Sequence, residues 1–200
     1  MTTEKGEADV IKEFLNIGMG RAAGILNKLV SQHINMIPPE FVETSGDHFS
    51  HEEKNPAFVI YQEFSGELDG FGVLLFDEKS GKQLGQLVAR NAGEETYNDE
   101  DLHDIVSEVG NNTINAIAGT LVDQVRNKVS FSPPALKIGC QSDILMPILK
   151  GWEKVVFGRA GFSIRDYQIE GLLILGFSET SYHRFLDIVK KIVLDVDEVG

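Results

Sequence analysis

Two long segments of the chain show apolar residues at helical spacing, one starting at Asp9 and the other at Asp104. Apolar positions recur every three or four residues, and polar residues fill the opposite side. This pattern predicts two amphipathic helices that each bury one side in the core. The expected core-facing positions are Val10, Ile11, Phe14, Leu15, Ile25, Leu26 and Leu29 in the first helix, and Val106, Val109, Ile117 and Leu121 in the second.

Each helical segment is followed by β-branched and aromatic runs with turn-forming residues between them, which indicates a β-hairpin in each half of the chain. A further helical pattern closes each half. The expected hairpins are 57–64 with 70–76 and 154–164 with 168–177, and the closing helices lie near 80–90 and 179–193. We expect the polar segment 43–56 to be an exposed loop, and 91–101 to be a linker that caps the next helix.

The two halves are copies of one unit, because residues 9–39 align without gaps to residues 104–134. The aligned identities are Asp9/Asp104, Glu13/Glu108, Asn16/Asn111, Gly24/Gly119, Leu26/Leu121, Pro38/Pro133 and Pro39/Pro134. We therefore expect repeats of about 9–92 and 101–193, each built as helix, strand, strand, strand, helix. The predicted fold class is α/β (α+β): a single domain over 1–200 with a pseudo-two-fold axis and a mixed β-sheet flanked by helices.

The composition is that of a folded protein with a negative net charge. With 200 residues, 42% of them hydrophobic, the chain is long enough to bury a core. Its formal charge of -13 argues against nucleic acid as a partner, because that binding depends on Lys and Arg at the phosphates. The single cysteine, Cys140, excludes an intramolecular disulfide. Neither a secretory signal nor an apolar run of membrane-spanning length is present, so we expect a cytoplasmic protein without membrane insertion.

One polar face recurs in both helical segments. Positions i, i+4 and i+7 fall within about 60° of each other around a helix, so residues at this spacing share one side. The two sets are Asp9, Glu13 and Asn16 in the first helix, and Asp104, Glu108 and Asn111 in the second. A single Glu-x2-Asn would most simply be a solvated helix face. Its retention in both copies indicates a function, since a solvent face tolerates almost any polar residue and asparagine is a poor helix former.

The repeated residues meet the pattern Asp/Ser-x3-Glu-x2-Asn-x22-Pro in full twice. They are Asp9, Glu13, Asn16 and Pro39 in the first copy, and Asp104, Glu108, Asn111 and Pro134 in the second. In this pattern, and over nearly its whole length, the chain resembles the CheC, CheX and FliY phosphatases of bacterial and archaeal chemotaxis. Two motif copies resemble CheC more than CheX, and nothing here supplies the additional flagellar-switch domain of FliY. Leu15 departs from the glycine that relatives often have before the Asn, whereas Gly110 retains it.

The resemblance implies a phosphatase that hydrolyses the aspartyl phosphate of a CheY-like response regulator. It assigns catalysis to Glu13, Asn16, Glu108 and Asn111, with asparagine orienting the attacking water and glutamate anchoring the partner. A side-chain amide suits this role because it both accepts and donates hydrogen bonds, and phosphoryl transfer depends mainly on positioning. The phosphorylated regulator carries Mg²⁺, and the CheD deamidase is a second candidate partner. The chain itself is expected to need no cofactor and no metal of its own.

The other residues of the motif are expected to have architectural roles. Asp9 and Asp104 are assigned to the amino ends of their helices, where acids interact favourably with the helix dipole. Pro39 and Pro134 are expected to begin or bound the following strand.

Alternatives to this interpretation lie in the same residues and in two further motifs. An adaptor that docks a response regulator or CheD without turnover is the main alternative to a phosphatase. Gly18, Gly20 and Gly24 do not fit a dinucleotide loop, because they follow a helical pattern and not a strand, and close helix packing explains them better. His48 and His51 lie in a polar loop that offers no scaffold to fix metal ligands.

Overall fold

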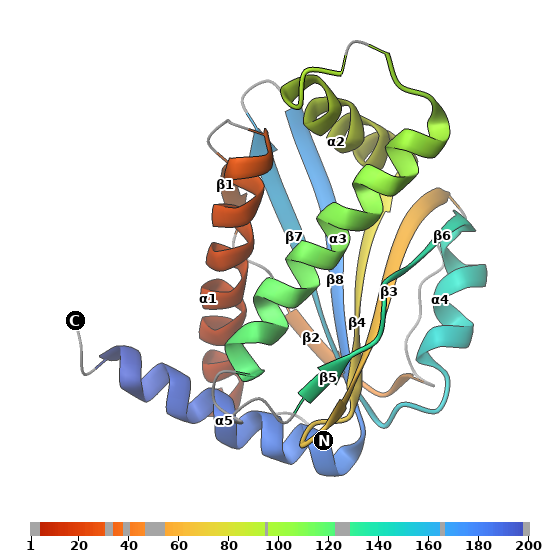
Figure 1. Cartoon of the computed structure of the whole chain (residues 1–200). Coiled ribbons are helices and arrows are strands. Elements are labelled where there is room, and N and C mark those ends of the chain that lie inside the picture. The colour runs from red at the N-terminus through yellow and green to blue at the C-terminus, as the bar shows by residue number, and fades with distance from the viewer. Residues whose placement is uncertain are drawn as a thin grey trace.

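Two long helices lie side by side across one face of a single β-sheet (Figure 1). They run in opposite directions and pack against each other. The computed structural model describes residues 5–30, 34–37, 41–46, 55–94, 96–122, 129–164 and 167–197.

The predicted helices and hairpins are present, together with shorter elements. The helices are α1 Lys5–Val30, α2 Glu78–Asn91, α3 Asp99–Val122, α4 Gln141–Leu149 and α5 Glu179–Asp197. The strands are β1 Ile34–Ile37, β2 Phe41–Thr44, β3 Pro56–Gly66, β4 Gly70–Asp77, β5 Val129–Phe131, β6 Ala135–Cys140, β7 Lys154–Ile164 and β8 Tyr167–Phe177. Both long amphipathic helices, both hairpins and both closing helices are therefore confirmed.

The two halves of the chain exchange strands within the sheet. The strand order is β1-β7-β8-β4-β3-β5, with β2 also pairing with β7 and β6 also pairing with β3. The short strands β1 and β2 of the first half thus pair with β7 in the hairpin of the second half. In the same way, β5 and β6 of the second half pair with β3 in the hairpin of the first half. The closing helices cross over in the same way, since α2 packs against α3 and α5 against α1. Each half therefore depends on the other to bury its apolar surface.

The pseudo-two-fold axis passes between β4 and β8. Their register runs from Gly70 opposite Phe177 to Phe76 opposite Gly171, with Val73 opposite Ile174 at the centre. We expected a mixed sheet, but every strand pairing among the described residues is antiparallel. Hairpins supply antiparallel neighbours, and a two-fold axis normal to the sheet makes the central strands antiparallel as well.

Three short elements were missing from the expected unit. Each half has two short strands before its hairpin where we expected one, and α4 follows the short strands of the second half. Strands of three or four residues carry little sequence signal, and an apolar run as short as α4, with Pro147 inside it, does not distinguish helix from strand. The expected loop 43–56 begins within β2, and residues 47–54, with His48 and His51, lie outside the described residues, as does Pro39.

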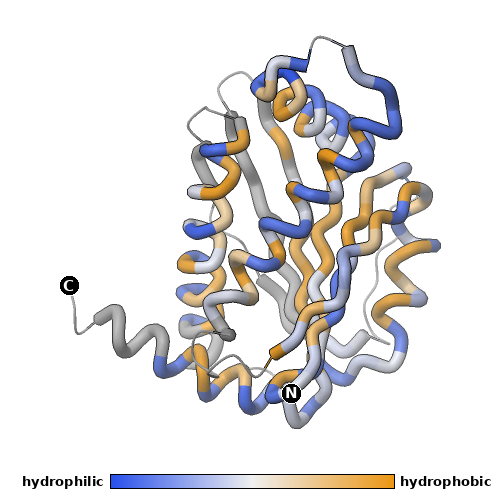
Figure 2. The backbone as a smooth tube through the Cα atoms, in the orientation of Figure 1, coloured by the Kyte–Doolittle hydropathy of each residue, from blue (hydrophilic) through white to orange (hydrophobic). Residues whose placement is uncertain are grey.

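The sheet separates a larger hydrophobic core from a smaller one. The larger core lies under the four longer helices, where the ring of Phe185 stacks on Phe177 with centroids 4.6 Å apart and meets Phe14 edge-on at 5.4 Å. The smaller core lies on the opposite face, where Leu145 and Leu149 of α4 cover the strands. Figure 2 shows the corresponding division, with mostly hydrophobic central strands and hydrophilic positions recurring along the outer sides of α1 and α3. None of the described helices combines the length and apolar character that crossing a membrane requires.

Candidate functional site

The core-facing sides of α1 and α3 agree with the helical pattern in the sequence. The buried residues among the expected positions are Ile11, Phe14, Leu15, Leu26, Val106, Val109 and Ile117, while Ile25 and Leu29 are partly buried. The side chains of Val10 and Leu121 lie outside the described part of the chain. Burial of these stripes fixes the opposite sides of both helices toward solvent.

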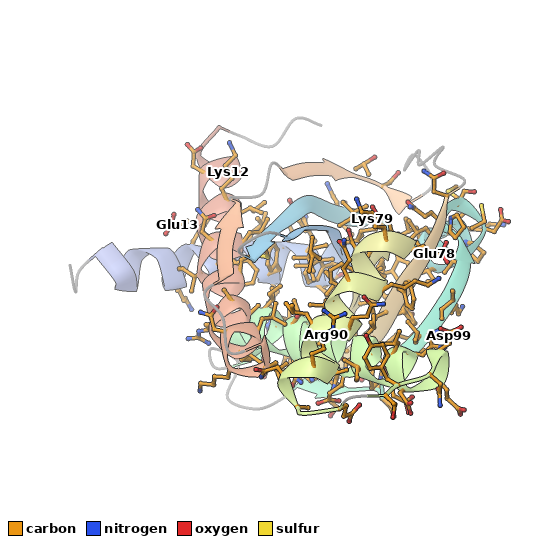
Figure 3. The ribbon with its side chains drawn as sticks, turned by 90° about the horizontal axis from the view of Figure 1, so that it is seen from above. Lys12, Glu13, Glu78, Lys79, Arg90 and Asp99 are labelled. Carbon is orange, nitrogen blue, oxygen red and sulfur yellow. The ribbon has the colours of Figure 1, made fainter. Side chains whose placement is uncertain are left out.

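The first motif lies on the outer face of α1. Asp9, Glu13 and Asn16 are all exposed. Figure 3 shows Glu13 directed away from the sheet, beside Lys12 on the same helix. Among the described residues, no hydrogen bond or ion pair holds the Glu13 carboxylate or the Asn16 amide. Both groups are therefore open to a partner surface.

The second motif lies on the outer face of α3 and is less exposed. Asp104 and Glu108 are exposed, whereas Asn111 is half-buried. The Nδ2 group of Asn112 donates to Oε1 of Glu108 at 2.9 Å, across one helical turn. The second glutamate is thus held by a hydrogen bond, and the first glutamate has no equivalent bond among the described residues.

The two motifs form two separate sites. Where α1 and α3 cross, Gly18 lies so close to Ile117 that a Cβ atom built on the glycine would come within 3.2 Å of the Ile117 Cα. Asn16 precedes this contact in α1 and Asn111 precedes it in α3. Figure 1 shows that the two helices run in opposite directions. A residue that precedes the contact in α1 and one that precedes it in α3 must therefore lie on opposite sides of the crossing, which places Asn16 and Asn111 apart.

An amide network surrounds the second asparagine. On β3, Nε2 of Gln62 donates to the backbone oxygen of Ser132 at 2.8 Å and to Oδ1 of Asn111 at 3.3 Å. Nδ2 of Asn115, one turn along α3, donates to the same Asn111 oxygen at 2.9 Å. Gln62 is only 3% exposed. Oε1 of Gln62 and Oδ1 of Asn115 are buried and have no hydrogen-bond partner within the described residues.

Glycines bring α3 close enough to the sheet for this network. A Cβ atom at Gly110 would lie 2.6 Å from Cγ1 of Ile60 on β3, and one at Gly72 on β4 would lie 2.7 Å from Cγ2 of Ile114. Side chains at either glycine would therefore push the helix and the sheet apart. In α1 the position equivalent to Gly110 is Leu15, whose side chain is 1% exposed and fills the space beneath the helix.

A reciprocal cap fixes the start of α3. Oδ1 of Asn98 accepts from the backbone N–H of Asp101 at 3.0 Å, and Oδ2 of Asp101 accepts from the backbone N–H of Asn98 at 2.8 Å. This capping box confirms the expected role of the linker. The helix-end role expected for Asp9 and Asp104 is wrong, because α1 begins at Lys5 and α3 at Asp99, so both acids lie beyond the first turn.

An open cleft of about 440 Å³ lies between α1 and α3. It is lined by Arg21, Gly24, Ile25, Lys28, Asn115, Ala116 and Gly119. The expected close helix packing at the three glycines of α1 is confirmed at Gly18, which lies against Ile117. It is wrong at Gly20 and Gly24, where an added Cβ would meet nothing within 4 Å. The absence of side chains at these two positions instead leaves the outer face of the helix pair open.

Sequence reasoning missed Gln62, although the pattern of β3 contains a signal. Phe58, Ile60 and Phe64 share one side of this strand and are buried in the larger core, and Gln62 interrupts this apolar row. Pro134 directly precedes β6, as expected for a residue that bounds a strand. In the ranges that the structure describes, no group of three or more His, Cys, Asp or Glu side chains is arranged to hold a metal ion.

Known proteins resemble this chain in sequence and in fold. The CheC-like family model matches residues 7–43, from α1 through most of β2. The structure of Thermotoga maritima FliY has a TM-score of 0.70 at 25% identity and covers 96% of this chain and 96% of its own. CheX in the CheX-CheY-BeF3-Mg complex from Borrelia burgdorferi has a TM-score of 0.54 at 20% identity, over 83% of this chain and 98% of its own. No curated protein matches the chain significantly.

The same fold also occurs in a flagellar protein at much lower identity. The FliM middle domain from H. pylori has a TM-score of 0.64 at 8% identity, over 93% of this chain and 99% of its own. Likeness at the identity of FliM or CheX shows the fold alone, because one fold hosts different functions.

Fold and site together define an α+β protein with two long helices over one antiparallel sheet and a Glu-x2-Asn face on each helix. The family-model match over residues 7–43 and the similarity to FliY support the CheC/CheX/FliY family for this chain. They do not single out CheC within the family, so the closer likeness to CheC stays a prediction.

Proposed function

We propose that this chain is a phosphatase for the aspartyl phosphate of a CheY-like response regulator. The observation that carries the proposal is the duplicated Glu-x2-Asn on the outer faces of α1 and α3, with the apolar sides of both helices buried. The similarity to FliY over 96% of both chains supports it, as does the CheX relative in complex with CheY.

In the proposed reaction a water oxygen bonds to phosphorus while the bond from phosphorus to the aspartyl oxygen breaks, which releases inorganic phosphate and the free carboxylate. The phosphorylated regulator supplies the Mg²⁺ that neutralises phosphoryl charge, and this chain contributes no metal. Asn16 and Asn111 position the attacking water, because an amide offers hydrogen bonds without changing its protonation state. Positioning accounts for much of the acceleration in phosphoryl transfer.

Glu13 and Glu108 anchor the partner in this proposal. Both carboxylates are exposed and lie one helical turn before the asparagine, so each can pair with a cation beside the phosphoryl group of the regulator. Docking of the helix also excludes bulk water, which strengthens these interactions. Loss of a carboxylate should therefore raise KM more than it lowers kcat.

The decisive experiment measures phosphate release from a phosphorylated CheY-like regulator with the Asn16→Ala/Asn111→Ala double variant. We expect the accelerated rate to fall on the order of 10²-fold or more, toward the unassisted rate of the regulator, since a lost catalytic hydrogen bond costs that much elsewhere. Asn55→Ala, which changes an exposed asparagine outside both motifs, is the matched control and should retain full activity. Unaltered release by the double variant would contradict the proposal.

The same assay separates a phosphatase from an adaptor. The FliM middle domain shares this fold, and so does a chain of an H. pylori FliG-FliM complex, so the fold is compatible with docking alone. An adaptor would bind the regulator, or the CheD deamidase as a second candidate, with no increase in phosphate release. Binding measured alongside release therefore distinguishes the two functions.

A further inference from the structure

The hydrogen bonds of the amide network at the second motif have fixed donors and acceptors. The backbone oxygen of Ser132 can only accept a hydrogen bond, so it fixes Gln62 with Nε2, and not Oε1, on that side. The second hydrogen of the same nitrogen then points to Asn111 and requires an acceptor there. Asn111 meets this requirement with Oδ1, which also accepts from Asn115.

Asn111 consequently presents its nitrogen to the outside. Its carbonyl oxygen is engaged by two donors within the protein, at 3.3 and 2.9 Å, which leaves Nδ2 as the free end of the amide. The pair Asn111–Asn115 could satisfy its own hydrogen bond in the reverse direction, which would also give the buried Oδ1 of Asn115 a donor. Gln62 opposes that arrangement, because its Nε2 would then face the Nδ2 of Asn111.

We propose that Gln62 is a positioning residue of the second site, which locks the Asn111 amide with Nδ2 outward so that it donates to the attacking water or to a phosphoryl oxygen. This inference rests on the proposed function for its catalytic consequence, whereas the amide orientation can be measured without it. Gln62 is almost fully buried beneath Asn111, so it acts through the Asn111 amide.

Within the part of the chain that the structure describes, the first site lacks this device. Gln62 pairs with Gly72 of β4. The pseudo-two-fold equivalent of Gly72 is Leu173, which pairs with Gly158 of β7. Gly158 is therefore the residue of the first site that corresponds to Gln62. Glycine has no side chain that could orient Asn16. Any change at Gln62 should therefore affect one site and spare the other, which provides an internal control.

The activity test places Gln62→Met in an Asn16→Ala background and in an Asn111→Ala background. In the first, only the second site works, and we expect kcat to fall on the order of tenfold with KM nearly unchanged, because the amide is misoriented. In the second, only the first site works, and kcat should not change. Equal losses in both backgrounds, or no loss in either, would overturn the positioning role while the proposed function stands.

The orientation test uses Gln62→Glu and does not depend on activity. A carboxyl group carries at most one proton and cannot donate to both Ser132 and Asn111, so Asn111 should invert and turn Nδ2 inward. We expect solvent exchange of the Asn111 side-chain NH₂, followed by NMR, to slow on the order of tenfold once that group is buried. The NH₂ of Asn112, which bonds Glu108 on the outer face, is the control and should be unaffected.

The activity test and the orientation test can give negative results independently of each other. Unchanged exchange at Asn111 in the Gln62→Glu variant would contradict the locked orientation, whatever the activity. If the Asn111 amide inverts in the Gln62→Glu variant but the parent protein shows no phosphatase activity, the result would support the locked orientation of Asn111. The same result would reject the proposed function.

Discussion

α1 and α3 carry the same three motif residues in different surroundings. Asn16 is exposed and unattached within the described part of the chain, whereas Asn111 is half-buried and held by Gln62 and Asn115. Glu13 stands free among those residues, whereas Glu108 accepts from a neighbouring amide. Duplication of a motif therefore preserves its residues without preserving how firmly they are held.

Two substitutions between the halves contribute to this difference. Gly110 lets α3 approach Ile60, while Leu15 fills the equivalent space under α1. β3 has Gln62 where β7 has Gly158. Both differences favour pre-organisation of the second site, since a group already held in place loses less freedom when the partner binds.

The largest expected effect separates the two asparagines. Asn111→Ala should lower phosphate release on the order of tenfold, because it removes the pre-organised site, while Asn16→Ala should change it less than about twofold. Release from a phosphorylated regulator, measured with each single variant, checks this ranking. Equal losses would show that the packing difference has no catalytic consequence.

A second variant tests the close approach of α3. Gly110→Ala gains about 1 kcal/mol in helix propensity but forces a methyl group into Ile60, so we expect a net loss of about 1–2 kcal/mol in the free energy of unfolding. Denaturant titration measures this change. Gly119→Ala is the matched control, since its Cβ meets nothing within 4 Å, and it should gain stability. Gain of stability by both variants would refute the packing role of Gly110.

The smallest expected effect concerns the cap of α3. Asn98→Ala removes the side-chain acceptor for Asp101 and should cost about 1 kcal/mol of unfolding free energy. Because the amide network lies more than two turns away, kcat should stay unchanged. Asn98→Asp keeps an acceptor and serves as the control in thermal unfolding. A parallel fall in kcat would mean that helix stability, and not the local network, sets the second site.

The sequence by itself determined the long helices, both hairpins and the two-fold repeat, because these depend on periodicity and local turn chemistry that neighbouring residues report. It also placed Glu13, Asn16, Glu108 and Asn111 on outer helix faces, since helical spacing and a buried apolar stripe are enough for that.

Only the tertiary structure decided how the halves exchange strands and which asparagine is held. Gln62 lies 49 positions from Asn111 in sequence, and pairing of β3 with β4 and packing of α3 on both are needed to bring their amides together. Contacts of that separation depend on the whole sheet, and no local pattern specifies them. The sequence therefore identified two equal motifs, and packing made them unequal.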